Sequence, residues 1–352
     1  MSKSQGTGRR ATLADVAQLS GVDRSTASRI LNGSTKQSAR PETRKRVLDA
    51  ARELDYRPDT IAKSLRSGRT ETLALFIPNL ENFGFVGVSR GVQKAAHELG
   101  MLVLMIEASR ETEPGRQRIE EALERRVDGI LVASTESNDP LMETFARLSV
   151  PVVLVNRRAI ASAYPFVVVD DARGSEIAVD HLISLGHRRI GHIAGDQETD
   201  TGRRRLKGFR ATMKQHAIPV PPRWIQTGGY ISKTGYQATL KLLKECRARD
   251  AELPTALYVA NLASCLGVLM ALRESGIRVP QDMSIVAMDD HAVAAGVDPG
   301  ITTVAMPHER MGSEAVHMLT EIRDGQKAKS LVIQGDEHLV VRGSTSPPRE
   351  LV

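Results

Sequence analysis

The stretch that decides the fold of the N-terminal region is Thr12–Asn32, TLADVAQLSGVDRSTASRILN. Its apolar residues recur at the i, i+3, i+4 spacing of two short amphipathic helices: Leu13, Val16 and Ala17, then Ala27, Ile30 and Leu31. Gly21 permits a sharp turn between them, and Asp23 is a suitable N-cap for the second helix. The stretch therefore predicts two helices bent around a tight turn.

The second of these helices has a distinctive solvent face. Opposite its apolar stripe lie four side chains that are cationic or form hydrogen bonds: Arg24, Ser25, Ser28 and Arg29. A face without bulky aliphatic groups suits a helix whose outer side lies in a DNA major groove. The same pattern also fits a helical hairpin whose polar face only meets water, so the choice depends on the rest of the chain.

Charge is distributed unevenly along the chain. Residues 1–70 hold 15 Lys and Arg against 7 Asp and Glu, a net charge of +8, whereas the whole chain has a net charge of +6. The remaining residues therefore carry −2. A basic region joined to a nearly neutral one is typical of a nucleic-acid-binding module fused to a domain with another task.

Length and composition narrow the class of protein. A chain of 352 residues predicts two or three domains, and 41% apolar residues are enough for substantial cores, which must be mainly aliphatic because aromatic residues make up 3%. Cys246 and Cys265 lack the spacing of a disulfide framework or a metal clip. No apolar run reaches 18 residues. We expect a cytoplasmic protein without a membrane partner.

The rest of the basic region predicts a third helix and a short linker. Pro41 is well placed in the first turn of a helix over Pro41–Asp55, whose apolar stripe would close a three-helix core. A break at Tyr56–Pro58 precedes a segment with Asp59 as cap and Gly68 as stop. Because a helix of about nine residues is marginal in water, we expect it to form only when DNA or a second subunit holds it.

Three motifs in this region, TLADVAQLSGVDRSTASRILN, PETRKRV and YRPDTIAKSLRSGRT, resemble the lactose-repressor/galactose-repressor (LacI/GalR) family of bacterial transcription regulators. The resemblance implies an all-α helix-turn-helix DNA-binding head over residues 1–57, whose second helix enters the major groove. It also implies a hinge helix in the linker of residues 58–70, which enters the minor groove. The chain departs from the family at Asp23, usually serine, and at Asp59, often asparagine.

The resemblance also assigns DNA contacts to particular residues. Base reading is implied for three of them: Arg24, Ser25 and Arg29. A bidentate contact from Arg29 to guanine would contribute about 1–3 kcal/mol of discrimination. Phosphate contacts, which fix register without reading sequence, are implied for Thr12, Thr26, Ser28 and Asn32. The minor-groove contacts of the hinge would come from Ala62, Lys63 and Leu65, with the leucine wedged between base pairs.

From residue 72 the pattern changes to short apolar runs that alternate with amphipathic helical stretches. This alternation predicts doubly wound parallel sheets, and about 280 residues would form two such units. Eight runs are expected to be strands: Thr72–Pro78, Leu102–Glu107, Gly129–Ala133, Val152–Asn156, Phe166–Val169, Arg189–Ala194, Ala256–Val259 and Ser284–Met288.

This region continues the resemblance through VDDARGSEIAVDHLISLGHRRIGHIAG, RLKGF, PTALYVAN, PQDMSIVAMDD and ITTV. The resemblance implies a periplasmic-binding-protein-like effector-binding and dimerisation domain over residues 71–343, in which the chain crosses three times between two α/β subdomains. The first is expected over about 71–170 and 305–333, the second over about 171–304 and 334–343, with 344–352 as a tail. Ligands bind such folds in the cleft between the lobes, at the carboxyl ends of the strands.

Eight residues are expected in that cleft. Arg205, just before Leu-Lys-Gly-Phe, matches an arginine that clamps effector oxygens, and its planar guanidinium suits vicinal hydroxyls or a carboxylate. Asn261 and Asp289 each follow an apolar strand and match two polar effector contacts. The other expected cleft residues are Asn156, Tyr230, Phe83, Phe85 and His308.

Three positions of the cleft depart from the family pattern. Leu262 stands where the family usually has aspartate, and Met288 replaces the tyrosine of a common Gly-Tyr-Asp-Asp. His308 stands where an aromatic or another effector-side group is common. These departures indicate a pocket that differs from the usual one of the family.

Two further patterns have structural interpretations. His181, His187 and His192 are spaced by 6 and 5 residues, which matches no zinc motif, and His187 lies in a helix-to-strand turn as a structural histidine would. The arginines at 203–205 are interpreted as one ligand arginine with two solvated neighbours. Neither a metal nor an organic cofactor is expected.

Together these features predict a DNA-binding transcription regulator, in particular a repressor, that binds a palindromic operator as a homodimer and responds to a small effector. A sugar or sugar acid is the favoured effector, and a nucleobase is the second choice. A sugar-binding protein without a DNA role would lack the basic head, and a sugar-modifying enzyme would need a general acid and base paired in the cleft. The tail has no heptads, so we expect a dimer rather than a tetramer.

Overall fold

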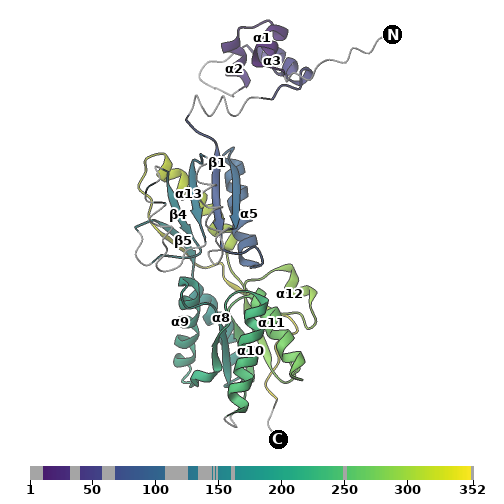
Figure 1. Cartoon of the computed structure of the whole chain (residues 1–352), viewed down its shortest axis with the longest axis vertical. Coiled ribbons are helices and arrows are strands. Elements are labelled where there is room, and N and C mark those ends of the chain that lie inside the picture. Colours follow the sequence, from purple (N-terminus) through teal and green to yellow (C-terminus); the bar gives the residue numbers. More distant parts are fainter. Residues whose placement is uncertain are drawn as a thin grey trace, which may run out of the picture. The chain divides into compact units, whose positions relative to one another are not determined.

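The computed structural model of the protein describes residues 11–31, 40–57, 68–107, 126–133, 145, 147, 150–159, 163–248 and 252–349. The chain divides into two compact units, Met1–Thr70 and Glu71–Val352, which we call the head and the body (Figure 1). Four residues with predicted DNA contacts lie outside the described residues: Asn32, Ala62, Lys63 and Leu65.

The described part of the head contains three helices, α1 (Leu13–Ser20), α2 (Arg24–Leu31) and α3 (Pro41–Glu53). A capping box begins α1, in which the Asp15 amide donates to Thr12 Oγ1 and the Thr12 amide donates to the Asp15 carboxylate. Gly21 ends the helix at φ 65°, a conformation that glycine adopts without strain. The predicted tight turn is therefore present, and all three helices bury their apolar stripes in one small core.

The body contains two six-stranded sheets. The first has the strand order β11-β5-β4-β3-β1-β2, from β1 (Thr72–Ile77), β2 (Leu102–Glu107), β3 (Gly129–Val132), β4 (Val152–Val155), β5 (Phe166–Val169) and β11 (Leu331–Ile333). The second has the order β12-β10-β9-β8-β6-β7, from β6 (Ile190–Ala194), β7 (Ile225–Thr227), β8 (Ala256–Val259), β9 (Ser284–Met288), β10 (Thr302–Ala305) and β12 (His338–Val340). Neighbouring strands in the described residues run parallel, except that β12 is antiparallel to β10.

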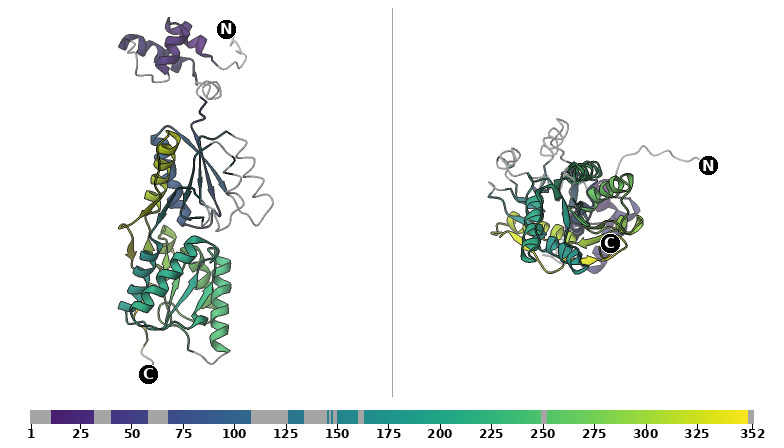
Figure 2. Two further views of the ribbon diagram at one scale, coloured as in Figure 1. Left: turned by 90° about the vertical axis from the view of Figure 1, so that its left-hand side faces the viewer. Right: turned by 90° about the horizontal axis from the view of Figure 1, so that it is seen from below.

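Helices cover both faces of the second sheet and a face of the first (Figure 2). The first sheet carries α5 (Gly84–Glu98) and α13 (His308–Arg323). The second carries α8 (Asp171–Ser184) and α9 (Asp200–Gln215) on one face, and α10 (Ser232–Arg247) and α11 (Leu262–Glu274) on the other. Shorter elements are the 3-10 helix η1 (Pro222–Trp224) and α12 (Ala292–Gly296). No helix among the described residues has the length and apolar character to cross a membrane.

We call each sheet with its helices a lobe, and the chain passes between the lobes three times. It leaves the first lobe between β5 and α8, returns between β10 and α13, and leaves again between β11 and β12. The segment expected as a tail begins inside the second lobe. Ser344 is fully buried, and its hydroxyl donates to the Ile285 carbonyl at 2.7 Å.

The helix pairs of both lobes approach each other through reciprocal glycines. A Cβ on Gly91 of α5 would overlap the carbonyl oxygen of Glu309 in α13, and one on Gly312 of α13 would overlap that of Val88 in α5. In the second lobe, Gly235 of α10 and Gly267 of α11 stand in the same relation to backbone atoms of the facing helix. Each pair is therefore in contact through its backbones.

The substitution Gly312→Ala should destabilise the body, because the new Cβ has to push α5 and α13 apart. Overpacking of this kind costs about 1–3 kcal/mol in free energy of unfolding. Gly296→Ala is the matched control, because a Cβ there meets no atom within 4 Å. Urea unfolding followed by circular dichroism would compare the two variants, and equal midpoints would contradict the close approach.

Candidate functional site

The exposed face of α2 carries the side chains expected to contact DNA. Arg24, Ser25 and Arg29 are exposed, whereas Ala27 and Ile30 are buried in the head core. Two residues with expected phosphate contacts, Thr26 and Ser28, are half-buried at the edges of this face. The helix thus presents a cationic, hydrogen-bonding surface to solvent, as a recognition helix requires.

Asp23 holds the start of this helix together. Its Oδ1 accepts hydrogen bonds from the Ser25 hydroxyl at 2.5 Å and the Thr26 amide at 2.9 Å, and its Oδ2 accepts from the Thr26 hydroxyl at 2.6 Å. These bonds, that of the Ser25 hydroxyl above all, lower the pKa of Asp23 well below its usual value. The family departure at this position therefore keeps a capping function, and hydrogen bonds stabilise its anion locally.

Arg29 lies back along its own helix. Its Nε donates to the Ser25 carbonyl at 3.3 Å and its Nη2 donates to the Thr26 hydroxyl at 3.1 Å. Hydrogen bonds that water can replace contribute little net free energy, so the guanidinium can swing out toward a base at small cost.

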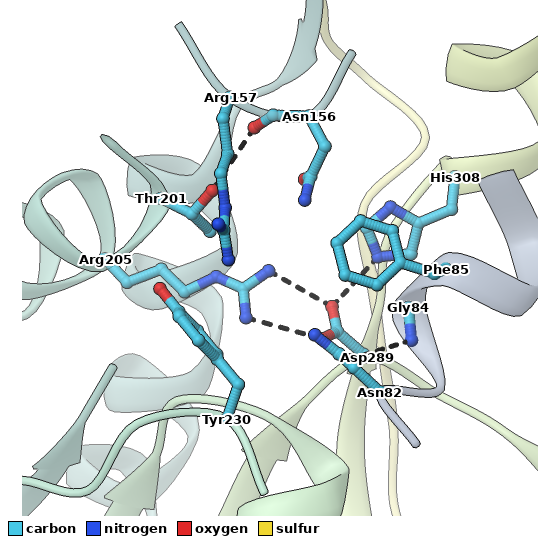
Figure 3. A pocket seen from close by; sticks show the side chains of 10 residues that line it. All are labelled: Asn82, Gly84, Phe85, Asn156, Arg157, Thr201, Arg205, Tyr230, Asp289 and His308. Atoms are coloured by element: carbon cyan, nitrogen blue, oxygen red, sulfur yellow. Dashed lines mark hydrogen bonds and ion pairs between the residues drawn. The ribbon is translucent and has the colours of Figure 1, made fainter. Parts of the chain in front are cut away.

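A pocket lies between the two lobes of the body (Figure 3). Its free space is about 10 Å³, room for about one water molecule. Most of the lining residues lie just after strand ends or near the starts of helices: Asn82, Gly84, Phe85, Asn156, Arg157, Thr201, Arg205, Tyr230, Asp289 and His308. This is the edge where the carboxyl ends of parallel strands open a crevice.

Arg205 is at the centre of a buried ion cluster. Its Nε donates to Asp171 Oδ1 at 2.7 Å, and its Nη1 and Nη2 donate to the two oxygens of Asp289 at 3.3 and 3.2 Å. Its Nη1 also donates to the Ala260 carbonyl. The guanidinium predicted to clamp an effector is thus already held by two carboxylates of the second lobe.

Asp289 links this arginine to the first lobe. Its Oδ1 accepts a hydrogen bond from His308 Nε2 at 2.9 Å, at the first residue of α13. Burial alone would raise the pKa of Asp289, but the charge of Arg205 and the bond from His308 outweigh it and lower the pKa to about 2. The carboxylate is therefore ionised, and it accepts hydrogen bonds from one residue of each lobe.

The arginine next to Arg205 is not a solvated neighbour, which corrects the sequence interpretation. The Arg204 side chain is 14% exposed and pairs with Asp171, while its Nε donates to Asp200 at 2.9 Å. The two oxygens of Asp200 also accept hydrogen bonds from Arg158, from Nε at 3.0 Å and from Nη2 at 2.9 Å. Since Arg158 belongs to the first lobe and Asp200 to the second, this ion pair bridges them beside the pocket.

Tyr230 and Asn156 form another wall of the pocket. The Tyr230 hydroxyl lies 2.9 Å from the Thr199 hydroxyl, and the Arg157 guanidinium lies over the tyrosine ring, 5.4 Å from its centroid. Asn156 has φ 67°, and its Oδ1 is buried without a hydrogen-bond partner among the described residues. A strained residue with an unsatisfied polar atom is typical of a ligand site.

The structure brings six of the eight predicted cleft residues to the pocket and leaves two outside its lining: Asn261 and Phe83. Asn261 caps α11, because its Oδ1 accepts from the Ser264 amide at 3.0 Å. The Phe83 ring stacks on His291, with centroids 4.8 Å apart.

Sequence reasoning missed three polar lining residues: Asn82, Arg157 and Thr201. Asn82 lies two residues before the start of α5, Thr201 lies in the first turn of α9, and Arg157 directly follows Asn156. A search of the residues next to each strand end and helix start would have found them.

The histidine cluster is structural. His187 Nδ1 bonds to the Thr255 hydroxyl and its Nε2 to the Ser346 carbonyl, each at 2.9 Å, which confirms the interpretation of this residue. In the described part of the chain, no group of three or more His, Cys, Asp or Glu could hold a metal ion.

Buried His192 should make the body acid-sensitive. It stacks on Tyr258, its Nε2 has no hydrogen-bond partner in the part of the chain that the structure describes, and burial lowers its pKa to about 4. Because the unfolded chain takes up this proton near pH 6.5 and the folded chain does not, stability falls between pH 6.5 and 4, by on the order of 3 kcal/mol. His192→Phe should flatten that slope in urea midpoints followed by Trp224 fluorescence, and an unchanged slope would exclude this histidine as its source.

Comparisons with known proteins agree with both units. Residues 12–59 match the family model "Bacterial regulatory proteins, lacI family", and residues 179–345 match "Periplasmic binding protein-like domain". HTH-type transcriptional regulator DegA of Bacillus subtilis is 32% identical over 96% of this chain and 99% of its own length. HTH-type transcriptional repressor PurR of Haemophilus influenzae is 31% identical over 88% of this chain and 90% of its own.

Solved structures show the same architecture. A complex of the transcriptional regulator CelR with cellobiose superposes with a TM-score of 0.70 and 32% identity, over 95% of this chain and all of that one. The lac repressor dimer bound to operator and the anti-inducer ONPF superposes with a TM-score of 0.78 and 26% identity, over 96% of this chain and all of that one.

The fold and the site define a two-lobed ligand-binding body joined to a helix-turn-helix head. The chain belongs to the lacI family of bacterial regulatory proteins. It is a DNA-binding transcription regulator, and its relatives are regulators rather than enzymes.

Proposed function

We propose that the protein represses transcription by binding a palindromic operator as a homodimer, and that a small effector between the lobes changes this binding. The exposed cationic face of α2 is the observation that carries the proposal. A two-fold dimer matches a palindrome because each protomer places one recognition helix in one half-site. A regulator of this kind works at the chromosome, so we expect it in the cytoplasm.

The proposed DNA contacts divide into two kinds. Arg24, Ser25 and Arg29 would reach base edges, because their side chains stand on the exposed face of α2. The other proposed contacts fix the register on the phosphates or enter the minor groove: Thr12, Thr26, Ser28 and Asn32 on phosphates, and Ala62, Lys63 and Leu65 in the hinge.

The polar lining of the pocket favours a sugar or sugar acid as effector. Asn156, Arg157 and Thr201 offer hydrogen-bonding groups that suit a ligand with several hydroxyls. The solved complex of the relative CelR contains cellobiose, which agrees with this class. The rings of Phe85 and Tyr230, which also line the pocket, support a nucleobase as the second candidate.

The control of DNA binding follows from the two lobes. A ligand seated between them favours one relative pose over another, and it shifts the equilibrium only by its difference in affinity for the two poses. A coupling free energy of about 1–3 kcal/mol is typical. The free space of about 10 Å³ means that the lobes must separate before a sugar-sized ligand can enter.

A thermal-shift screen of the full chain against sugars, sugar acids and nucleobases would test the effector half of the proposal. A ligand at 100 times its dissociation constant stabilises its site by about 2.7 kcal/mol, and the melting point should rise accordingly. Each hit would then be added to a complex with an operator selected from random-sequence DNA. Absence of any hit would contradict the effector classes named, and selected sites without two-fold symmetry would contradict the dimer.

A further inference from the structure

Two residues that the sequence assigns to the effector, Phe83 and Asn261, join the lobes directly. Phe83 lies in the loop between β1 and α5 of the first lobe, and its ring stacks on His291 of the second lobe at an interplanar angle of 17°. The half-buried Phe83 also packs against the apolar core that α10 and α11 form on the second sheet. An aromatic side chain of one lobe is thus seated on the other.

The neighbouring residue makes a second contact across the same gap. Asn261 Nδ2 donates to Asn82 Oδ1 at 3.2 Å, and it also donates to the Tyr230 carbonyl at 3.0 Å. Asn82 and Asn261 are both at least nine-tenths buried, so the loss of either bond would leave a buried polar group without a partner. Asn82 Oδ1 at the same time accepts a hydrogen bond from the Gly84 backbone amide, at the first residue of α5, at 3.2 Å.

We infer that the segment Asn82–Phe83 is a latch that favours the closed pose of the lobes, with His291 and Asn261 as its seat. Closure needs an attractive contact between the lobes, and here the chain supplies one from its own side chains. The latch lies beside the pocket. Asn82 and Gly84 line the pocket, whereas the Phe83 ring between them in sequence is outside its lining. Phe83 therefore sets how readily the pocket opens without touching the ligand inside.

The latch also accounts for the small free space of the pocket. With Phe83 seated, α5 begins close to the ion cluster, and a Cβ on Gly84 would lie 3.3 Å from Asp289 Oδ2. An effector that enters must first unseat Phe83, and the latch can close again behind it. The inference rests on the proposed function only in that the movement of the lobes carries the effector signal.

Distance measurement between spin labels tests the latch without effector or DNA. The exposed positions Lys94→Cys in α5 and Ala295→Cys in α12 place one label on each lobe, and the native cysteines are buried. Labelled chains diluted into unlabelled ones report distances within one protomer. Phe83→Ala should raise the open-to-closed ratio by about two- to tenfold, the range that an aromatic pair commonly contributes.

Matched variants separate the latch from general destabilisation. Phe83→Tyr retains the stacked ring and should keep the wild-type distances, and Leu80→Ala changes an exposed side chain of the same loop and should do the same. His291→Ala removes the stack from the other lobe, so it tests the latch even if Phe83→Ala fails to fold. The double variant should open no further than Phe83→Ala alone. Unchanged distances in both single variants would overturn the inference, whatever the effector screen shows.

Discussion

Replacing Arg29 by alanine should abolish most of the sequence-specific DNA binding. A bidentate arginine–guanine contact contributes about 1–3 kcal/mol, and a dimer loses one in each half-site, so operator affinity should fall roughly 30- to 20,000-fold. Arg29 is exposed, and its hydrogen bonds to Ser25 and Thr26 on its own helix lie on the exposed face, so the head should remain folded. Titration of a selected operator at fixed salt measures the effect.

Arg52→Ala is the matched control for this prediction. Arg52 is an exposed arginine of α3 whose side chain is 81% exposed, and its loss removes the same charge away from α2. Both variants should lose a similar small amount of affinity for random-sequence DNA. An Arg29 variant that loses operator and random DNA equally would show that this residue supplies charge and not base recognition.

Replacing Arg205 by methionine should destabilise the second lobe more than any surface substitution. The Arg205 side chain is 3% exposed, and its guanidinium forms ion pairs with two buried carboxylates, Asp171 and Asp289. Removal of one partner from a buried ion pair costs about 3–5 kcal/mol, because the remaining charge has lost its compensation. Urea unfolding followed by the fluorescence of Trp224, the single tryptophan of the chain, reports on this lobe.

The pair of Arg310 with Asp336 provides the comparison. These side chains are 52% and 53% exposed, and such a pair contributes at most about 1 kcal/mol. Arg310→Met should therefore shift the unfolding midpoint slightly or not at all. Equal shifts for the two arginines would mean that the Arg205 cluster is not held together by its buried charges.

The sequence was sufficient to predict the elements with long or regular patterns. The two helices around Gly21 and the eight predicted strands are all present, because their apolar spacing is local and uninterrupted. Strands β7, β11 and β12 were not predicted, since each has three residues and too few positions for a pattern to show. The four-residue β10 overlaps the motif ITTV of the family resemblance, but it was not predicted as a strand.

The pocket was predicted in place but not in its internal bonding. Family resemblance located Arg205 and Asp289, yet nothing in a linear pattern shows that they bind each other across 84 residues. The stacking of Phe83 on His291 could not be predicted for the same reason, because the two residues come together only in the folded arrangement of the lobes. A resemblance transfers positions along the chain, whereas partners depend on how this chain packs.

The reciprocal glycines in the helix pairs of both lobes have a mechanical consequence. Helices in contact through their backbones cannot slide past each other without first separating, so shear inside a lobe is costly. The three single-chain connections between the lobes have no such restraint. Relative motion should therefore be a rotation of two stiff blocks about these connections, a hinge movement rather than a shear. When a stiff block rotates in this way, a movement of α5 at the pocket is transmitted to the far end of the same helix.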